Sequence, residues 1–376
     1  MAKRYPAVFA RGGTSKALLF HLRDLPPERS QWDPIFLAAM GSPDLHGRQL
    51  DGMGGGVSSL SKVCVVGPPT REDADVDYTF AQVQVKEARV DYGGNCGNML
   101  SAIGPFAVDE GLVRADDGEA TVRIHNTNTR KIIVSRFAVA DGRSVERGNL
   151  AIPGVSVTGA PVRLDFLEPG GASTGKLLPS GNVIDLLADA GGTVEASLVD
   201  AANACVFVAA ASLGLAGTEL PEELERRTDV LARLADLRAA GSVAMGIARS
   251  TADARANRMI PLIACVSAPQ DSRTLAGETI PASAADLVVR MISNGQPHRA
   301  LPVTGSLCTA VASAITGSVP NRLVGAERRG PLRLAMPSGV ITLEAAVAQE
   351  GGAWHARQGT FYRTTRRLFE GFVYAP

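Results

Sequence analysis

Lys62 and Cys96 are the two residues of this chain whose surroundings best suit proton transfer. Lys62 stands at the start of an apolar run in SSLSKVCVV, in a chain in which most positive charges are arginines. A lysine can lose its proton when it is desolvated, whereas an arginine effectively cannot. Lys62 is therefore a candidate base, and an ordinary exposed lysine at a strand end is the alternative.

Cys96 lies in the glycine- and asparagine-rich stretch DYGGNCGNMLSAIGPF, just before an expected helix. Glycines let the backbone approach a ligand closely, and the N–H groups at a helix start attract anions. The same position would stabilise a thiolate, so Cys96 is a candidate acid–base group. Asn95, Gly97 and Asn98 are candidate substrate contacts beside it. The alternative is a plain turn around a small buried cysteine.

Two further loops could contact an anionic substrate. The stretch RGGTSKALLF lacks the spacing of a nucleotide-binding P-loop, but its Gly13, Thr14 and Ser15 could hold a carboxylate. The stretch TGSLCTAVASAIT has a cysteine ahead of a small-residue helix, like the stretch around Cys96. Its candidate residues are Thr304, Gly305, Ser306 and Cys308.

Two histidines lie beside these loops. His298, in QPHRALPVTG, is a candidate substrate contact. His125, in VRIHNTNTR, could reach the same place, although a hydrogen-bonded structural imidazole is the favoured interpretation there. The histidines show no metal-ligand spacing and the five cysteines form no CxxC pair, so we expect no metal, no disulfide framework and a reducing cytoplasm.

The composition narrows the class of protein further. Hydrophobic residues make up 45% and charged residues 20% of the 376 residues, and Lys+Arg and Asp+Glu both number 38. This balance is typical of a soluble globular protein and speaks against a nucleic-acid partner. No apolar stretch is long enough to cross a membrane and no signal-peptide core precedes the first strand. We expect a cytoplasmic protein that forms a homodimer, the commonest closed oligomer.

The sequence predicts that most of the elements that position these residues are strands. Short runs rich in Val, Ile, Phe and Thr, separated by Gly, Pro and Asp, predict strands in YPAVFA, KALLFHL, KVCVVG, DYTFAQVQV, TVRIHNT, KIIVSRFAVA and VRLDFLE. Helical spacing predicts long helices over 221–240 and 283–294. Strands outnumber helices and do not alternate regularly with them, so the fold class is α+β.

The chain divides into similar halves near the glycine-rich DAGGT at residues 189–193, which predicts domains 1–188 and 189–376. Each half has a strand-rich beginning and then a glycine-containing, cysteine-containing stretch that leads into a small-residue helix. Two such helix N-termini converging on one cleft would suit a substrate with two negative ends.

The ordered set of RGGTSK, the SK before a strand, GNCGN, HRA and TGSLCTA resembles the PrpF family of allylic isomerases. SLVDAANACVFV and KLLPSGNVIDLL extend the similarity nearly end to end, and Ala17 departs from the glycine usual after the loop lysine. The resemblance implies a diaminopimelate-epimerase-like fold, in which two similar domains each wrap a curved sheet around a central helix and share an active site between them. It also implies an enzyme without metal, nucleotide or pyridoxal phosphate.

Members of this family shift a proton across an allylic unit of methylaconitate, methylitaconate or oxalomesaconate. The resemblance makes Lys62 the base and Cys96 a neighbouring acid or ligand group. Removing the proton creates a dienolate-like anion, which N–H groups at helix starts can stabilise. Of these substrates we expect 2-methylaconitate, converted from trans to cis in propionate breakdown through the methylcitrate route.

Two other functions stay open. A racemase or epimerase would use Cys96 and Cys308 on opposite sides of a substrate carbon. A protein of another class would bind tricarboxylates without catalysis and support a partner dehydratase.

Overall fold

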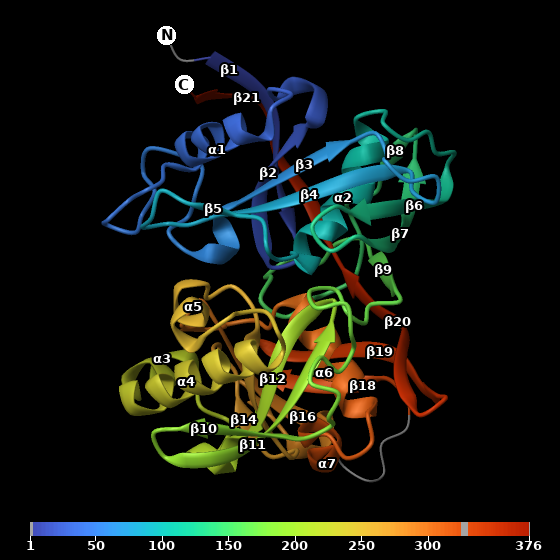
Figure 1. The fold of residues 1–376 in the computed structure, drawn as a ribbon. Helices are drawn as coiled ribbons and strands as arrows, with labels where there is room; N and C mark the ends of the chain where they lie inside the picture. Colours follow the sequence, from blue (N-terminus) through green and yellow to red (C-terminus); the bar gives the residue numbers. More distant parts are fainter. Residues whose placement is uncertain (1–2, 325–329, 376) are drawn as a thin grey trace. The chain divides into compact units, whose positions relative to one another are not determined.

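The computed structural model describes residues 3–324 and 330–375, which form two compact units. Unit 1 comprises Met1–Asp165 and Tyr362–Pro376, and unit 2 comprises Phe166–Phe361 (Figure 1). The chain returns to unit 1 because its last strand, β21 (Thr365–Ala375), pairs antiparallel with its first, β1 (Lys3–Gly12).

These bounds differ from the division at residue 188 that the sequence predicts. The glycine-rich stretch taken there as a join is the tight turn between β10 (Asp185–Asp189) and β11 (Gly192–Ala201), inside unit 2. Gly192 has a φ of 123°, a backbone conformation that glycine adopts readily. The glycines therefore serve a hairpin and do not mark a domain boundary.

Unit 1 is one mixed sheet with a helix on each face. Its helices are α1 (Trp32–Met40) and α2 (Gly97–Asp109), with 3₁₀ turns at Leu22–Asp24, Arg29–Gln31 and Ser58–Leu60. Its other strands are β2 (Ser15–His21), β3 (Lys62–Gly67), β4 (Val76–Val83), β5 (Val90–Asp91), β6 (Gly118–Asn126), β7 (Lys131–Ala140), β8 (Arg143–Ser144) and β9 (Val162–Leu167), the last of which ends in unit 2.

Unit 2 has the same kind of architecture. Its helices are α3 (Pro221–Arg226), α4 (Thr228–Ala244), α5 (Thr251–Ala256), α6 (Val303–Ala314) and α7 (Val319–Leu323), with 3₁₀ turns at Ala210–Leu213 and Ala282–Ala284. Its other strands are β12 (Asn203–Ala209), β13 (Leu262–Ser267), β14 (Ser272–Arg273), β15 (Thr279–Ile280), β16 (Leu287–Ser293), β17 (Gln296–Pro297), β18 (Leu332–Met336), β19 (Gly339–Glu350) and β20 (Ala353–Arg363), the last of which ends in unit 1.

The two sheets repeat one topology. In unit 1 the strands β1, β2, β3, β4, β6 and β7 pair in that order, with parallel pairs at β2–β3 and β4–β6. In unit 2 the strands β11, β12, β13, β16, β18 and β19 do the same, with parallel pairs at β12–β13 and β16–β18. The expected α+β fold of two similar domains is therefore confirmed, and α2 and α6 occupy the same place in the two topologies.

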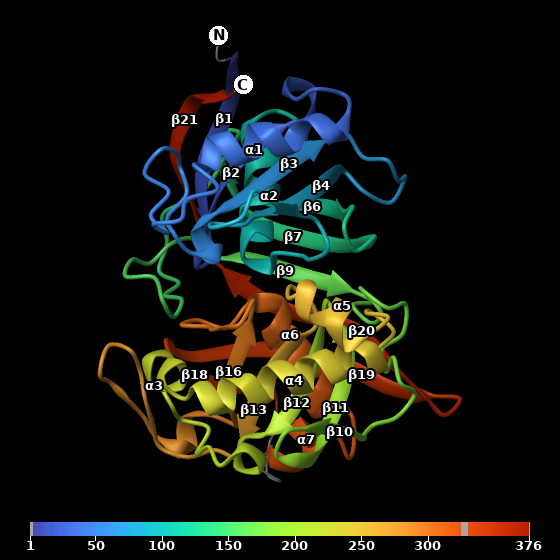
Figure 2. The same cartoon turned by 60° about the vertical axis from the view of Figure 1, so that its left-hand side comes forward.

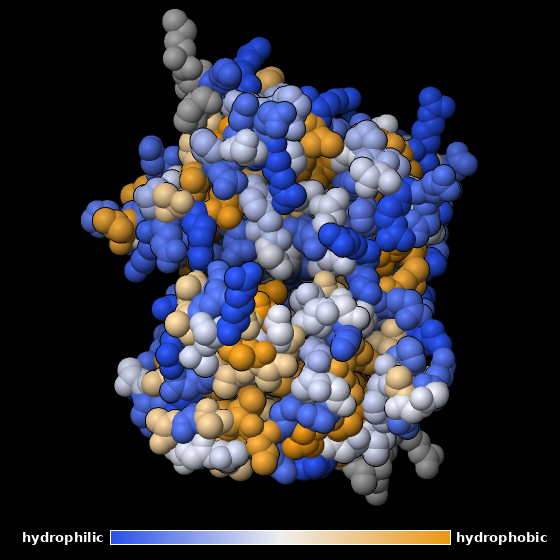
Figure 3. Space-filling model, in the orientation of Figure 1, coloured by the Kyte–Doolittle hydropathy of each residue, from blue (hydrophilic) through white to orange (hydrophobic). Residues whose placement is uncertain are grey.

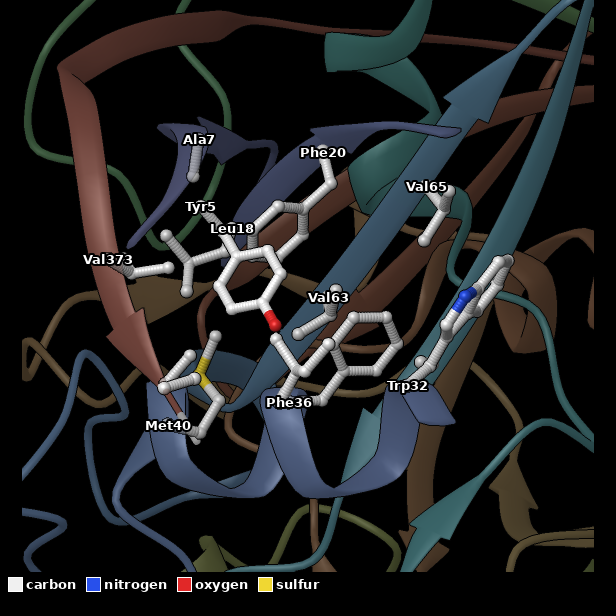
Figure 4. Close-up of a cluster of buried hydrophobic side chains, with 14 of the residues drawn as sticks. Tyr5, Ala7, Leu18, Phe20, Trp32, Phe36, Met40, Val63, Val65 and Val373 are labelled. Carbon is white, nitrogen blue, oxygen red and sulfur yellow. The ribbon is translucent and has the colours of Figure 1, made fainter. Parts of the chain in front are cut away.

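Alternation along the strands decides which side chains meet which helix. In unit 1, Val63 and Val65 of β3 pack with Phe36 of α1 in a buried apolar cluster (Figure 4). Cys64 points to the opposite face, where α2 lies and where the ring of its Phe106 packs 5.1 Å, centroid to centroid, from the ring of His21. A side chain at position 62 shares the face of Cys64, so the sheet directs Lys62 toward the side of α2.

Unit 2 separates its faces in the same way (Figure 2). Val206 and Val208 of β12 belong to the apolar cluster that holds Leu234 and Leu237 of α4. Cys205, which precedes Val206, points to the other face and lies against the thiol of Cys308 on α6. Each sheet therefore carries one helix that completes an apolar core on one face, α1 or α4, and a second helix, α2 or α6, on the other face.

Most predicted elements are confirmed, and one is wrong. Each of the seven predicted strand runs lies in a strand or extends at most two residues past its end, and the helix over 221–240 is α3 followed by α4. The helix predicted over 283–294 is strand β16, whose residues from Leu287 to Ile292 are all buried. A strand covered on both faces reads as a continuous apolar run, which periodicity alone does not separate from a buried helix.

The surface agrees with the balanced charge of the chain. Hydrophilic side chains cover much of the face seen in Figure 3, with apolar residues scattered between them. Within the described residues, none of the helices has the length and hydropathy that a membrane span requires.

Candidate functional site

Lys62 begins β3 as a buried side chain, only 8% exposed. Its Nζ donates a hydrogen bond of 2.5 Å to Oε1 of Gln82 on the neighbouring β4. The same Nζ lies 5.0 Å from the centre of the Phe80 ring. Among the described residues, Lys62 forms no ion pair with a carboxylate. The Lys62 side chain is thus held by a neutral amide oxygen and an aromatic ring.

Cys96 is the residue that precedes the first turn of α2, and it is 8% exposed. Its Sγ lies 4.0 Å from Oγ of Ser15 at the start of β2. No side chain accepts a hydrogen bond from the first-turn N–H groups of α2 as a helix cap would. The helix therefore presents a thiol and main-chain donors together, as the sequence predicts.

The pKa of the neighbouring Cys64 thiol depends on Lys62 and Cys96. Burial raises the pKa of the Cys64 thiol, a negative charge on Cys96 raises it further, and the hydrogen bond with Tyr78 and the charge of Lys62 lower it. Both Lys62 and Cys96 are therefore close enough to act electrostatically on the same buried thiol. Lys62 and Cys96, separated in the sequence, meet on the face of the unit 1 sheet that carries α2.

Asn98 joins the first hairpin to the start of α2. Its Nδ2 donates to Oγ1 of Thr14 at 3.1 Å, and its Oδ1 accepts from Nε of Arg363 at 3.1 Å. A Cβ on Gly13 would lie 2.2 Å from Asn98 Oδ1, and one on Gly12 would lie 2.7 Å from the Asn98 carbonyl oxygen. The two glycines are needed because the turn between β1 and β2 runs directly against the first turn of α2.

Arg363 is a member of this group that the sequence analysis did not identify. It is 5% exposed, and burial lowers the pKa of its guanidinium to about 10. The side chain therefore stays positive at neutral pH in a poorly solvated place beside Asn98. It lies 265 residues from Asn98 in the sequence, and no local motif marks it.

Asn95 and Gly97 hold the loop before α2 in place. Oδ1 of Asn95 accepts a 2.7 Å hydrogen bond from the fully buried Asn126, and Asn128 donates to the carbonyl of Tyr92 at 2.8 Å. Gly97 is buried as the first residue of α2. The described geometry gives Asn95 a role in fixing the loop, and its contact with substrate stays a prediction.

In unit 2 the predicted residues lie at the start of α6. Thr304, Gly305 and Ser306 form its first turn, and Ser306 Oγ donates to the carbonyl of Pro302 at 3.0 Å. A Cβ on Gly305 would lie 2.4 Å from Sδ of Met291, so the helix packs closely on β16. The anion-binding role of this turn stays a prediction.

Cys308 does not begin a helix, contrary to the expectation. It lies in the second turn of α6, is fully buried, and its Sγ donates to the carbonyl of Val199 at 3.3 Å. The place that Cys96 has before α2 is taken before α6 by Pro302. The small residues Thr304–Ser306 hid this shift, because they can form either a loop or a first helical turn.

The histidines have different roles. His125 is buried, and its Nδ1 lies 2.8 Å from Oδ1 of Asp77, so the structural interpretation of this residue holds. His298 is half-buried, and its main-chain N–H donates to the carbonyl of Met291 at 2.9 Å. Throughout residues 3–324 and 330–375, His, Cys, Asp and Glu side chains form no group of three that could hold a metal ion.

The chain matches the family model described as "PrpF protein" over residues 2–376. It is 39% identical to a 3-methylitaconate isomerase of Eubacterium barkeri, covering 99% of this chain and 97% of the relative. It is 36% identical to a 2-methyl-aconitate isomerase of Cupriavidus necator, with 99% and 97% covered. It is 37% identical to a 4-oxalomesaconate tautomerase of Pseudomonas putida, with 98% and 96% covered.

Solved structures show the same relationship. A crystal structure of a methylitaconate-delta-isomerase is 39% identical and has a TM-score of 0.82, with 100% of this chain and 96% of that chain covered. A probable proline racemase of Agrobacterium radiobacter has a TM-score of 0.55 at 11% identity, over 98% and 92% of the two chains, and shows that the fold is shared. From the match along almost its whole length, the chain is an isomerase that belongs to the PrpF family.

Proposed function

We propose that this enzyme moves a proton across a three-carbon allylic unit of a short unsaturated di- or tricarboxylate. The observation that carries the proposal is the buried Lys62, held by neutral Gln82 and Phe80 on the sheet face where Cys96 opens α2. An amine that is shielded from water and has no carboxylate partner among the described residues suits a general base.

The reaction begins with neutral Lys62. Its lone pair takes the proton from the allylic carbon, which a conjugated double bond and a carboxylate acidify. The electron pair of the broken C–H bond passes into a dienolate-like anion. The same lysine, now an ammonium ion, returns a proton to the far carbon and is neutral again. Rotation about a bond of the intermediate, which has lost double-bond character, gives cis–trans isomerisation.

The developing negative charge needs donors that are already in place. The first-turn N–H groups of α2 supply such donors, and the guanidinium of Arg363 adds a positive charge beside Asn98. Burial lowers the pKa of Arg363 to about 10, so it remains charged at neutral pH and can pair with a substrate carboxylate. We assign Cys96 the role of hydrogen-bond donor or acid near Lys62.

Among the possible substrates we propose 2-methylaconitate, isomerised from trans to cis in propionate breakdown. The support is the similarity to the 2-methyl-aconitate isomerase of Cupriavidus necator together with the stretches KLLPSGNVIDLL and SLVDAANACVFV. The relatives that are named for methylitaconate and oxalomesaconate are slightly more similar, at 39% and 37% identity against 36%. Discrimination over one methyl group is only about 1–3 kcal/mol, so we expect side activities on these acids.

The two-cysteine racemase is less well supported by the residues present. Such an enzyme needs a second thiol placed as Cys96 is placed, and the corresponding position before α6 is Pro302. Cys308 is fully buried, and its thiol donates a hydrogen bond to the carbonyl of Val199.

The test is a substrate panel in deuterated water. Purified enzyme is incubated with 2-methylaconitate, aconitate, methylitaconate and oxalomesaconate, and solvent deuterium entering the allylic positions is followed by proton NMR. We expect the largest kcat/KM for 2-methylaconitate. A much larger value for oxalomesaconate would reassign the substrate, and binding without any exchange would instead support the non-catalytic accessory protein. The expected homodimer also stays a prediction, which sedimentation equilibrium tests.

A further inference from the structure

Gln82 is buried beside Lys62, and the groups around it leave its amide only one orientation. Its Nε2 lies 3.0 Å from the carbonyl oxygen of Ser58 and 2.9 Å from that of Ser61. A third carbonyl, that of Val83, lies at 3.3 Å. Turning the amide over would set its oxygen against these carbonyl oxygens and its NH₂ against the N–H groups of Lys62. The amide oxygen must therefore face the lysine.

The segment that supplies these carbonyls is itself fixed. Ser61 Oγ lies 2.6 Å from Oε1 of the buried Gln49 and 2.8 Å from the carbonyl oxygen of Val57, and its one O–H donates to one of these two oxygens. The amide nitrogen of Gln49 donates to Ser42 Oγ at 2.8 Å. Gln82 is thus the last link of a chain of buried amides and hydroxyls, and the chain ends on the Lys62 amine.

We infer that Gln82 is a positioning residue for Lys62: its oxygen accepts one N–H of the amine and so directs the lone pair of the neutral amine away from Gln82 and toward the substrate. An amide oxygen can only accept, so in both protonation states one N–H of Lys62 is committed to it. The ring of Phe80 covers another side of the amine. The lone pair is left to point into the space where the reacting carbon binds.

This inference rests on the proposed role of Lys62 as base. Titratable groups on this face include the thiols of Cys64 and Cys96, the phenol of Tyr78, the His21–Glu110 pair and the guanidinium of Arg363. Burial raises the pKa values of Cys64 and Tyr78. These two groups are therefore neutral at working pH. A carboxylate introduced at position 82 would consequently be a new negative charge beside Lys62.

The experiment compares kcat and KM against pH for the wild-type enzyme and the variants Gln82→Glu, Gln82→Met and Gln84→Glu. Gln84 lies two residues further along the same strand direction, just beyond β4, and provides the matched control for an added charge. The new carboxylate in Gln82→Glu keeps the lysine protonated to higher pH. We expect its ascending limb of kcat to move up by at least one pH unit, with at least tenfold lower kcat at pH 7 and a KM within threefold of wild type.

Gln82→Met removes the acceptor, which disfavours the ammonium form and frees the amine to rotate. Its ascending limb should move down in pH while its maximal kcat falls at least tenfold. Gln84→Glu should leave the limb within 0.3 pH unit of the wild-type one, a margin of about twofold in proton affinity. A residue that served only the fold would lower activity in both Gln82 variants without shifting their limbs in opposite directions.

Unchanged limbs in folded Gln82 variants, with Lys62→Met inactive, would overturn the inference and leave the proposed function standing. Wild-type and Lys62→Met enzymes that are equally inactive on every acid of the panel would instead refute the proposed function. If the Gln82 variants do not fold, wild-type protein with ¹⁵N-labelled glutamine decides. The Gln82 amide resonance, recognised by its change in Lys62→Met, must titrate with the midpoint of the ascending limb, and a resonance that does not titrate contradicts the inference.

Discussion

Replacing Gly13 by alanine tests the close approach between the first hairpin and the start of α2. Gly13 has a φ of 53°, where an alanine costs about 1–2 kcal/mol. The new Cβ would also lie 2.2 Å from Oδ1 of Asn98, so the Asn98 side chain must move. That movement breaks its hydrogen bonds with Thr14 and Arg363, worth about 0.5–1.5 kcal/mol for the neutral pair and about 1.5–3 kcal/mol for the charged one.

The expected loss of stability is therefore about 3–6 kcal/mol, most of it caused by the collision with Asn98. Gly111→Ala is the matched control, because Gly111 has a φ of 69° and nothing within 4 Å of the added Cβ. It should lose only the backbone contribution of about 1–2 kcal/mol. In the background Asn98→Ala, the cost of Gly13→Ala should fall close to the same small value, because the Asn98 amide is gone and only Cδ of Arg363, at 3.1 Å, stays near the added Cβ.

The assay is urea unfolding followed by the fluorescence of Trp32, which is buried in unit 1 as the first residue of α1. The second tryptophan, Trp354, lies in unit 2, so all variants carry Trp354→Phe and the signal reports unit 1 alone. Equal destabilisation by Gly13→Ala and Gly111→Ala, or an unchanged cost of Gly13→Ala without the Asn98 side chain, would refute the reasoning.

Two other perturbations have defined outcomes. Iodoacetamide should modify Cys96 before any other cysteine, because Cys96 is 8% exposed and the other four are at most 1% exposed; peptide mass spectrometry locates the label, and substrate should slow the reaction. Cys96→Ser should lower kcat without abolishing it, and equal labelling of Cys308 would count against this assignment. Burial raises the pKa of Glu110, but hydrogen bonds from His21 and Arg367 outweigh it and lower that pKa overall. The stabilisation is therefore present above the unfolded value of 4.5 and is lost as the pH falls below it. Glu110→Gln should cost about 1 kcal/mol at pH 7 and less as the pH falls below 4.5 in urea titrations, and a cost that does not depend on pH would contradict the pairing.

The strands of unit 1 could be predicted because their apolar runs are bounded by glycine, proline and aspartate. β16 could not, because Leu287–Ile292 is buried on both faces, and its apolar residues, interrupted by Arg290, fit a helix equally well. The place of Cys308 was misjudged for a similar reason. Nothing in Thr304–Ser306 distinguishes a loop from a first helical turn, and only the structure shows that α6 begins at Val303.

The candidate site likewise has residues that could be predicted from the sequence and residues that could not. Lys62 and Cys96 could be identified because each lies in a local context that alters its chemistry. Gln82 and Arg363 could not, because their importance comes from partners far along the chain, and a glutamine in a strand or an arginine near the C-terminus has many ordinary roles. Long-range pairing of strands brings them to the site, and that pairing leaves no signal in one sequence.

The most direct test of the central claim is the loss of proton exchange on removing the amine of Lys62. In Lys62→Met the side chain keeps an apolar stem but has no Nζ, so Oε1 of Gln82 loses its donor at a cost of about 1–3 kcal/mol, which should leave the protein folded. The measurement is deuterium entering the allylic position of 2-methylaconitate in deuterated water, with binding followed separately by calorimetry. A general base contributes about 10²–10⁴-fold, so exchange should slow by at least a hundredfold while the substrate Kd changes little. Exchange by Lys62→Met at close to the wild-type rate would contradict the account.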